Sequence, residues 1–256
     1  MTHLTRSESF RSRLRNREKL LGTFIKTPHP AIVEVLGHAP LDCVCLDAEH
    51  AAFDRRALDV AILAARSYDL PALVRVPRLD AADILGALDL GATGVVIPHV
   101  ATPADAWAVA AACRYRAGGR GYSGATRAAG FGTRTMPENV ARANAEVTVV
   151  AQIEDAEALN HLDEIASIDD IDALFIGRMD LTVSLGAPSP NDPAVLAAVQ
   201  DICAAARRHG RAVGMFTQTT DEAHEWFDAG ASLFLLASDQ QWILHGARAM
   251  RKAFDA

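Results

Sequence analysis

Two acidic residues follow two short apolar runs in the middle of the chain. Glu154 comes directly after residues 147–153, and Asp180 lies just beyond residues 173–176. Continuous apolar runs joined by a segment with helical periodicity predict parallel strands that are buried on both faces. Because the carboxyl ends of parallel strands meet at one edge, we expect the two carboxylates to lie close together. Such a pair suits a hard divalent cation such as Mg²⁺ or Mn²⁺, although both acids could instead cap the helices that follow them.

A histidine and an arginine take corresponding positions earlier in the chain. His50 closes the motif D-A-E-H at residues 47–50, and a side chain that titrates near neutrality suits general acid–base catalysis. Arg75 ends the next apolar run, where an arginine is typical of an anion or enolate clamp. The alternatives are a structural histidine and a structural salt bridge from Arg75 to either acid of the motif. Asp89 could orient His50 from the neighbouring unit.

The elements that must position these residues alternate regularly along the chain. We expect a helix at residues 4–18 and then eight strands separated by helices. The predicted strands cover residues 20–25, 42–46, 72–76, 94–100, 147–153, 173–176, 212–216 and 232–237. This alternation predicts an α/β protein with one domain, residues 1–256, folded as a (β/α)8 TIM barrel with an extra N-terminal helix. The main rival is an open doubly wound sheet, but no G-x-G-x-x-G follows the first strand to support dinucleotide binding.

In a TIM barrel the chemistry takes place at the face where the strands end. Several further strands are predicted to end in polar residues, and these are His99, Thr217, Ser238 and Asp239. We therefore expect the active site at this rim. The nearest lysine is Lys26, and we expect no lysine at the rim that could form a Schiff base.

The composition limits the classes of partner. A formal net charge of −7 at pH 7 argues against nucleic acid or an anionic membrane as the main partner. No apolar run is long enough to span a membrane, and the first residues are too polar for a signal peptide. The four cysteines lack the spacing of a metal site and are expected to be reduced, structural thiols. We therefore expect a cytoplasmic protein.

Residues 116–135 form a long irregular segment that is rich in glycine and carries several arginines. A phosphate site is one interpretation, but no P-loop pattern is present. We favour a flexible lid that becomes ordered when substrate or a partner binds.

Six motifs occur in order between Leu21 and the end of the chain. They are D-A-E-H at 47–50, V-R-V-P at 74–77, L-D-L-G-A-T-G-V-V-I-P at 88–98, R-G-Y-S at 120–123, Q-I-E at 152–154 and F-I-G-R-M-D-L-T at 175–182. Together they resemble the motifs of the HpcH/HpaI aldolase family. This family consists of class II, metal-dependent pyruvate aldolases, among them 4-hydroxy-2-oxoheptanedioate and 2-keto-3-deoxyglucarate aldolases.

The resemblance implies a role for each residue of the predicted rim. Glu154 and Asp180 would bind a divalent metal, Mg²⁺ or Mn²⁺, with Co²⁺ as a further candidate. Arg75 would stabilise the oxygen of a pyruvate enolate, and His50 would be the base, with Asp89 as its partner. The residues implied in holding the pyruvate moiety are Gln152, Gly177, Arg178 and Met179.

The implied reaction is the reversible aldol cleavage of a 4-hydroxy-2-oxo acid to pyruvate and an aldehyde. Two enzymatic alternatives are oxaloacetate decarboxylation and a citrate-lyase-like cleavage, and a non-catalytic ligand-binding barrel is an alternative from another class. The resemblance also implies a homo-oligomer, commonly a hexamer built of trimers, with the C-terminal helix exchanged between subunits.

The chain departs from the family pattern in two places. Arg178 stands where the motif G-P-x-D-L-S has proline, which puts a long cation beside the implied metal and carboxylate sites. The loop Y-P-P-x-G-x-R-G is altered at residues 115–121. Both changes leave the implied metal ligands in place. They put in question the second substrate and the balance between aldol cleavage and decarboxylation.

Overall fold

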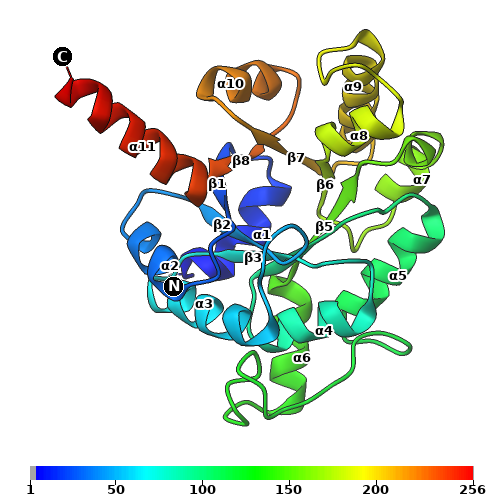
Figure 1. The fold of residues 1–256 in the computed structure, drawn as a ribbon. Helices are drawn as coiled ribbons and strands as arrows, with labels where there is room; N and C mark the ends of the chain where they lie inside the picture. The colour runs from blue at the N-terminus through cyan, green and yellow to red at the C-terminus, as the bar shows by residue number, and fades with distance from the viewer. Residues whose placement is uncertain (1–3, 256) are drawn as a thin grey trace.

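Eight parallel strands close into a barrel in the computed structural model, which describes residues 4–255 (Figure 1). Each strand pairs with the next one along the chain, and β8 pairs with β1. The strands are β1 (Leu20–Ile25), β2 (Cys43–Asp47), β3 (Ala72–Arg75), β4 (Gly94–Ile97), β5 (Thr148–Ile153), β6 (Ala173–Ile176), β7 (Ala212–Thr217) and β8 (Leu233–Ser238). The predicted TIM barrel is confirmed, and so is the extra helix before β1.

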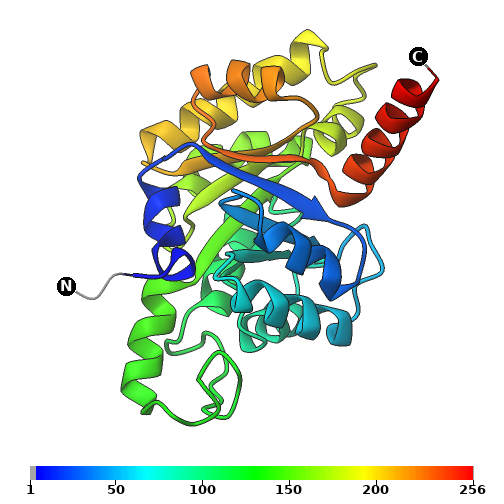
Figure 2. The ribbon, with the colours of Figure 1, turned by 90° about the vertical axis from the view of Figure 1, so that its left-hand side faces the viewer.

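Helices surround the barrel and connect its strands (Figures 1 and 2). They are α1 (Arg6–Arg15), α2 (Pro30–Gly37), α3 (Arg55–Ser67), α4 (Ala81–Asp89), α5 (Pro103–Cys113), α6 (Met136–Glu146), the 3₁₀-helix η1 (Ala156–His161), α7 (Leu162–Ala166), α8 (Arg178–Ser184), α9 (Pro193–Arg208), α10 (Thr220–Asp228) and α11 (Asp239–Phe254).

The sequence patterns do not predict two of these helices, α6 and α8. Helix α6 begins at a capping box, in which the Glu138 carboxylate accepts a hydrogen bond of 3.0 Å from the backbone N–H of Thr135. Its only buried residue is Asn139, so it lacks the apolar stripe by which amphipathic helices are found. Helix α8 has seven residues, which are too few turns for a periodic pattern.

The barrel interior is filled by side chains that alternate along the strands, including Phe24, Cys45, Leu73, Phe175 and Leu235. Helix α1 adds Phe10 and Leu14 to this interior group. Arg11 of α1 also pairs at 2.9 Å with Asp172, which directly precedes β6. Helix α1 therefore closes the end of the barrel at which the strands begin, and the polar residues gather at the other end.

All four cysteines are buried, free thiols, as expected. Burial raises the pKa of every one of them, to about 12 for Cys113 and about 11 for Cys203. Among the helices of residues 4–255, none is both long and apolar enough to cross a bilayer.

Candidate active site at the carboxyl ends of the strands

Arg75 is held rigidly at the end of β3 by the end of the neighbouring strand. The register pairs it with Asp47 of β2. Its Nε donates to Oδ1 of Asp47 at 3.0 Å, and its Nη2 donates to Oδ2 at 2.8 Å. Burial alone would raise the pKa of Asp47, but the hydrogen bonds and charge of Arg75 outweigh it, and the pKa is lowered. The salt bridge considered as an alternative role is therefore present, and it fixes a guanidinium that also lines a cavity.

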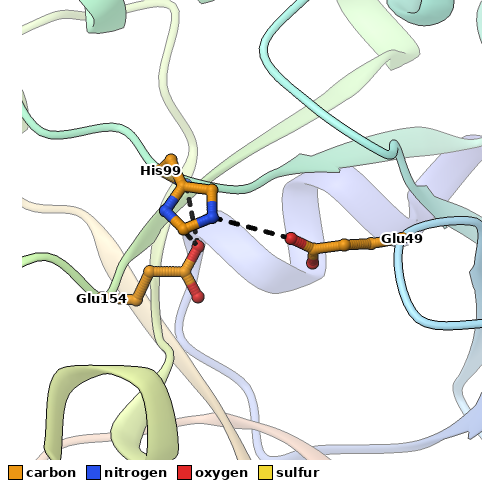
Figure 3. Close-up of side chains that lie close together, drawn as sticks. All are labelled: Glu49, His99 and Glu154. Carbon is orange, nitrogen blue, oxygen red and sulfur yellow. Dashed lines mark hydrogen bonds and ion pairs between the residues drawn. The ribbon is translucent and has the colours of Figure 1, made fainter. Parts of the chain in front are cut away.

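Three side chains from different loops lie close together beside this pair (Figure 3). Glu49 follows β2, His99 follows β4 and Glu154 follows β5, and one ligand atom of each lies within 4.8 Å of the others. Oε1 of Glu154 accepts a hydrogen bond of 2.8 Å from the backbone N–H of His99. Gln152 of β5 donates its side-chain amide to Glu154 Oε2. Acidic residues and imidazole therefore meet at the strand ends.

The charge balance of this cluster suits a divalent cation. Burial raises the pKa of the Glu154 carboxyl despite hydrogen bonds from Gln152 and His99. Burial likewise raises the pKa of Glu49, although Arg75 opposes it. Within residues 4–255, Glu49 Oε2 and Gln152 Oε1 are buried side-chain oxygens without a hydrogen-bond partner. Carboxylates and imidazole are typical metal ligands, and a bound cation would relieve the cost of burying these anions.

A cavity of about 520 Å³ opens next to this cluster. Most of the residues implied by the resemblance line it, and these are His50, Arg75, Gln152, Gly177, Arg178, Met179 and Asp180. Asp180 is exposed in the first turn of α8 and lies outside the group formed by Glu49, His99 and Glu154. Its charge nevertheless acts on Glu49, so the cavity and the cluster adjoin.

The model of one protein family, HpcH/HpaI aldolase/citrate lyase, matches residues 20–246. The chain belongs to this family. It is 33% identical to the hydroxypyruvate/pyruvate aldolase of Paraburkholderia phytofirmans over 95% of this chain and 96% of that one. It is 36% identical to the 4-hydroxy-2-oxovalerate aldolase of Rhodococcus jostii over 96% of this chain and 95% of that one. The family is described by aldolase and citrate lyase activities, and both relatives are named as aldolases, so the chain is a carbon–carbon lyase of the pyruvate aldolase class.

A solved structure supports the same assignment. The HpcH/HpaI aldolase/citrate lyase family protein of Burkholderia cenocepacia has a TM-score of 0.92 and 33% sequence identity. The comparison covers 97% of this chain and 100% of that protein. The barrel fold of this chain is therefore shared with a solved member of the HpcH/HpaI family.

Within the HpcH/HpaI barrel, His50 and Asp89 are not brought together in one chain. The Asp89 carboxylate accepts a hydrogen bond of 2.7 Å from Arg120, which belongs to the glycine-rich segment. Nε2 of the exposed His50 lies 3.7 Å from Oε2 of Glu49 instead. The backbone N–H of His50 donates to Asp47 at 3.1 Å. The partnership of Asp89 with His50 stays a prediction.

The departure at Arg178 has a clear structural consequence. The Arg178 guanidinium pairs with Glu222 of α10 and lies 5.7 Å from the ring centre of Trp226 on the same helix. Both Arg178 and Glu222 line the cavity. The cation thus links α8 to α10 at the cavity wall.

The expectation of a rim without lysine is wrong. Lys26 follows β1 and lines the cavity. Its ammonium lies 3.5 Å from Oδ2 of Asp47. Lys26 is held at the rim by the turn after β1. In this turn the Asp239 carboxylate accepts hydrogen bonds from the backbone N–H groups of Lys26 and Thr27 at 2.8 and 3.1 Å.

Sequence reasoning places His99 and Glu49 at the rim where the active site is expected but gives neither of them a role. The backbone of His99 has a positive φ of 55°, which is uncommon for a residue other than glycine. Its ring lies between the carboxylates of Glu154 and Glu49 (Figure 3). The sequence signal for His99 is that a polar residue follows the apolar run of β4. This signal does not reveal the direction of the His99 side chain.

Proposed function

We propose that the chain catalyses the divalent-metal-dependent, reversible aldol cleavage of a 4-hydroxy-2-oxo acid to pyruvate and an aldehyde. The observation that carries the proposal is the buried Glu154 carboxylate beside a cavity lined by Arg75 and His50. A base, a fixed cation and a metal-binding carboxylate are the three groups that enolate chemistry needs. The two relatives are named as aldolases of hydroxypyruvate and pyruvate and of 4-hydroxy-2-oxovalerate, and these names support this class of substrate.

Glu154 and Asp180 would hold the metal, which we propose to be Mg²⁺ or Mn²⁺, with Co²⁺ as a further candidate. When bound, such an ion supplies a Lewis acid that polarises the 2-oxo group of the substrate. Gln152 and the backbone of Gly177, Arg178 and Met179 would position the pyruvate moiety. All of these except Glu154 line the cavity, and Gln152 bonds Glu154 directly.

His50 starts the cleavage by taking the proton of the 4-hydroxyl group. The electron pair of that oxygen forms the aldehyde carbonyl as the C3–C4 bond breaks, and the pair of the broken bond passes into the pyruvate enolate. Arg75 stabilises the negative oxygen of the enolate, and it needs no reorientation because Asp47 already holds it at two points. Return of this proton from His50 to C3 of the enolate then releases pyruvate and restores the base.

The first test measures pyruvate release from 4-hydroxy-2-oxo acids with and without EDTA. We expect activity to disappear in EDTA and to return with Mg²⁺ or Mn²⁺, and we expect Glu154→Gln and His50→Ala to be almost inactive. Full activity in EDTA or in His50→Ala would contradict the proposal. The second substrate is then identified with a panel of aldehydes supplied together with pyruvate.

Lys26 makes a second test necessary, because a lysine in the cavity is a potential Schiff-base residue. We expect borohydride with pyruvate to leave the enzyme active, since the Lys26 ammonium is engaged by Asp47. Inactivation, with a stable adduct on Lys26, would assign the protein to lysine-based chemistry instead.

We also propose a homo-oligomer, with a hexamer as the expected form. Helix α11 projects away from the barrel in both views (Figures 1 and 2). It exposes four large apolar side chains, Ile243, Leu244, Met250 and Phe254, and an exposed apolar face of this kind marks an interaction site. Exchange of α11 between subunits would cover it. The buried, free thiols support a reducing compartment, and we propose a cytoplasmic location.

A further inference from the structure

We propose that His99 supplies a nitrogen ligand to the divalent ion. With this ligand, the site favours an ion such as Co²⁺ over Mg²⁺ more strongly than a site built only of carboxylates. The inference rests on the proposed function only in assuming that Glu154 binds the ion. It adds a residue, His99, and a metal preference that the carboxylates Glu154 and Asp180 do not supply.

The distances around His99 fit a shared ion. Its Nε2 lies 3.9 Å from Oε1 of Glu49, and its Nδ1 lies 3.5 Å from Oε1 of Glu154. Two ligand atoms that each lie about 2.1 Å from one metal ion cannot be more than about 4.2 Å apart. The contact of Nε2 with Glu49 falls inside this limit, and one ligand atom of each of His99, Glu49 and Glu154 lies within 4.8 Å of the others (Figure 3). Side-chain rotations that bring the Glu154 carboxylate closer to Nε2 would let the three residues share one ion.

A neighbouring carboxylate leaves the outer nitrogen of His99 available. Nδ1 lies 3.1 Å from Oδ2 of Asp155, so the tautomer that carries its proton on Nδ1 donates to Asp155. In that tautomer the lone pair of Nε2 points towards Glu49. Metal-binding histidines commonly donate their second ring N–H to a carboxylate in this way. The side chain of His99 is 59% exposed, so an ion can reach it from solvent.

The Glu49 carboxylate next to His99 is nearly buried and is not fully satisfied by hydrogen bonds. The Glu49 side chain is only 9% exposed, and within residues 4–255 its Oε2 accepts no hydrogen bond. Arg75 Nε lies 3.3 Å and His50 Nε2 lies 3.7 Å from this oxygen, and the other oxygen of Glu49, Oε1, faces His99. The carboxylates of Glu49, Glu154 and Asp155 all surround the His99 ring. This surplus of negative charge favours a divalent cation, and not an ion pair within the protein, as the group that neutralises these carboxylates.

Ligand chemistry predicts which ion benefits from His99. Mg²⁺ prefers oxygen ligands and keeps several waters, whereas imidazole suits the later transition metals. Removal of the imidazole should therefore weaken Co²⁺ binding and leave Mg²⁺ binding nearly unchanged. A histidine that serves only to pair with Asp155 would produce no such difference between the ions.

The test is calorimetric titration of the metal-free protein with Co²⁺ and with Mg²⁺. The variant is His99→Asn, because asparagine tolerates the positive φ of this position, and His50→Asn is the matched control on the same rim. We expect His99→Asn to weaken Co²⁺ binding by at least about tenfold and Mg²⁺ binding by less than about twofold. The visible absorption of the bound Co²⁺ should also shift in His99→Asn and not in His50→Asn.

Two results would overturn the inference. One is equal weakening of both ions in His99→Asn, and the other is no change in Co²⁺ affinity and spectrum. His99→Ala provides a second variant, with circular dichroism to confirm folding. Glu154→Gln separates this inference from the proposed function. If Glu154→Gln abolishes binding while His99→Asn does not weaken it, only the role of His99 fails. If Glu154→Gln still binds both ions, the metal site of the proposed function fails too.

Discussion

At the scale of single residues, the site depends on charges that are held in place before any substrate arrives. Arg75 is 7% exposed and is fixed by both oxygens of Asp47. Its guanidinium also lies 4.5 Å from the ring centre of Phe24, a residue of the barrel interior. A planar group fixed by two parallel hydrogen bonds cannot be replaced by the single-point ammonium of lysine without loss of geometry.

Arg75→Lys should therefore lower kcat for aldol cleavage by about 100-fold or more, the usual effect of losing one preorganised donor to an oxyanion. The affinity for pyruvate should change much less, since the enolate charge develops only in the transition state. Steady-state kinetics measures both. Arg78→Lys is the control because the Arg78 side chain is 71% exposed, and it should retain wild-type kcat. Wild-type kcat in Arg75→Lys would remove Arg75 from the mechanism.

The cysteines allow a second prediction at this scale. Burial raises the pKa of Cys113 to about 12 and that of Cys203 to about 11, and the thiolate is the form that reacts. At pH 8 the native protein should therefore show no rapidly reacting thiol with Ellman's reagent. After unfolding in guanidinium, all four cysteines should react. Rapid native labelling of one thiol would contradict the buried placement of that residue.

At the scale of elements, the turn from β6 into α8 joins Glu154, the proposed metal ligand, to the cavity wall. Gly177 stands in this turn, and its backbone N–H donates to the carbonyl of Ile153 at 3.0 Å. A Cβ added to Gly177 would lie 2.6 Å from both Cβ and Oε2 of Glu154. Glycine is required here by close approach, since its φ of −81° is open to any residue.

Gly177→Ala should displace the Glu154 side chain and weaken divalent metal binding by about tenfold or more, the range seen when the support of a ligand is disturbed. Calorimetric titration of the metal-free protein measures the loss. Gly246→Ala serves as the control, because a Cβ there meets nothing within 4 Å. Unchanged metal affinity in Gly177→Ala would show that Glu154 can move without consequence.

Helices α8 and α10 form one wall of the cavity through Arg178 and Glu222. Arg178→Pro restores the residue of the family motif and removes this link. Proline is compatible with the first turn of α8, and the ψ of 68° at Gly177 is outside the helical region, as a residue before proline requires. The stability of the fold should therefore change little.

The aldehyde preference of Arg178→Pro should change, and we expect ratios of kcat/KM between aldehydes to shift by about tenfold, a typical effect of altering one pocket contact. Glu222→Gln should shift the same ratios in the same direction, because it removes the charge that positions Arg178. Metal affinity should stay at the wild-type value in both variants. If the wild type, Arg178→Pro and Glu222→Gln showed the same aldehyde preferences, the aldehyde would bind away from this wall.

At the scale of the whole molecule, barrel closure brings the site residues together, and helix α11 contributes to the cavity beside them. Closure brings the ends of β2, β3, β4 and β5 to one rim, where Glu49, Arg75, His99 and Glu154 meet. Helix α11 leaves the barrel directly after β8, and its Leu244 lines the cavity. An oligomer formed through α11 would therefore influence the outer part of the cavity.

The double variant Met250→Glu and Phe254→Glu should reduce the oligomer to smaller species, since two exposed apolar side chains would each become a charge in a desolvated interface. Light scattering after size-exclusion chromatography measures the mass. Lys252→Ala is the control on the same helix and should keep the wild-type mass. An unchanged mass in the double variant would exclude this end of α11 from the interface.

The sequence by itself determined the fold and the principal set of polar residues. The apolar runs at residues 147–153 and 173–176 locate β5 and β6 to within one residue, because a strand buried on both faces must be continuously apolar. The strand predicted at residues 94–100 ends earlier, at Ile97. The position of each strand end then places His50, Arg75 and Asp180 on the rim. The helices α6 and α8 were beyond this reasoning, since a polar helix and a single short one leave no apolar period.

Only the tertiary structure decided which rim residues contact one another. His99 lies 3.5 Å from Glu154, Lys26 lines the cavity while Asp239 holds its backbone, and Asp89 is paired with Arg120. Each of these contacts joins residues that are distant in the chain. Their partners depend on barrel closure and on local backbone conformation, and the period of apolar residues carries no information about either.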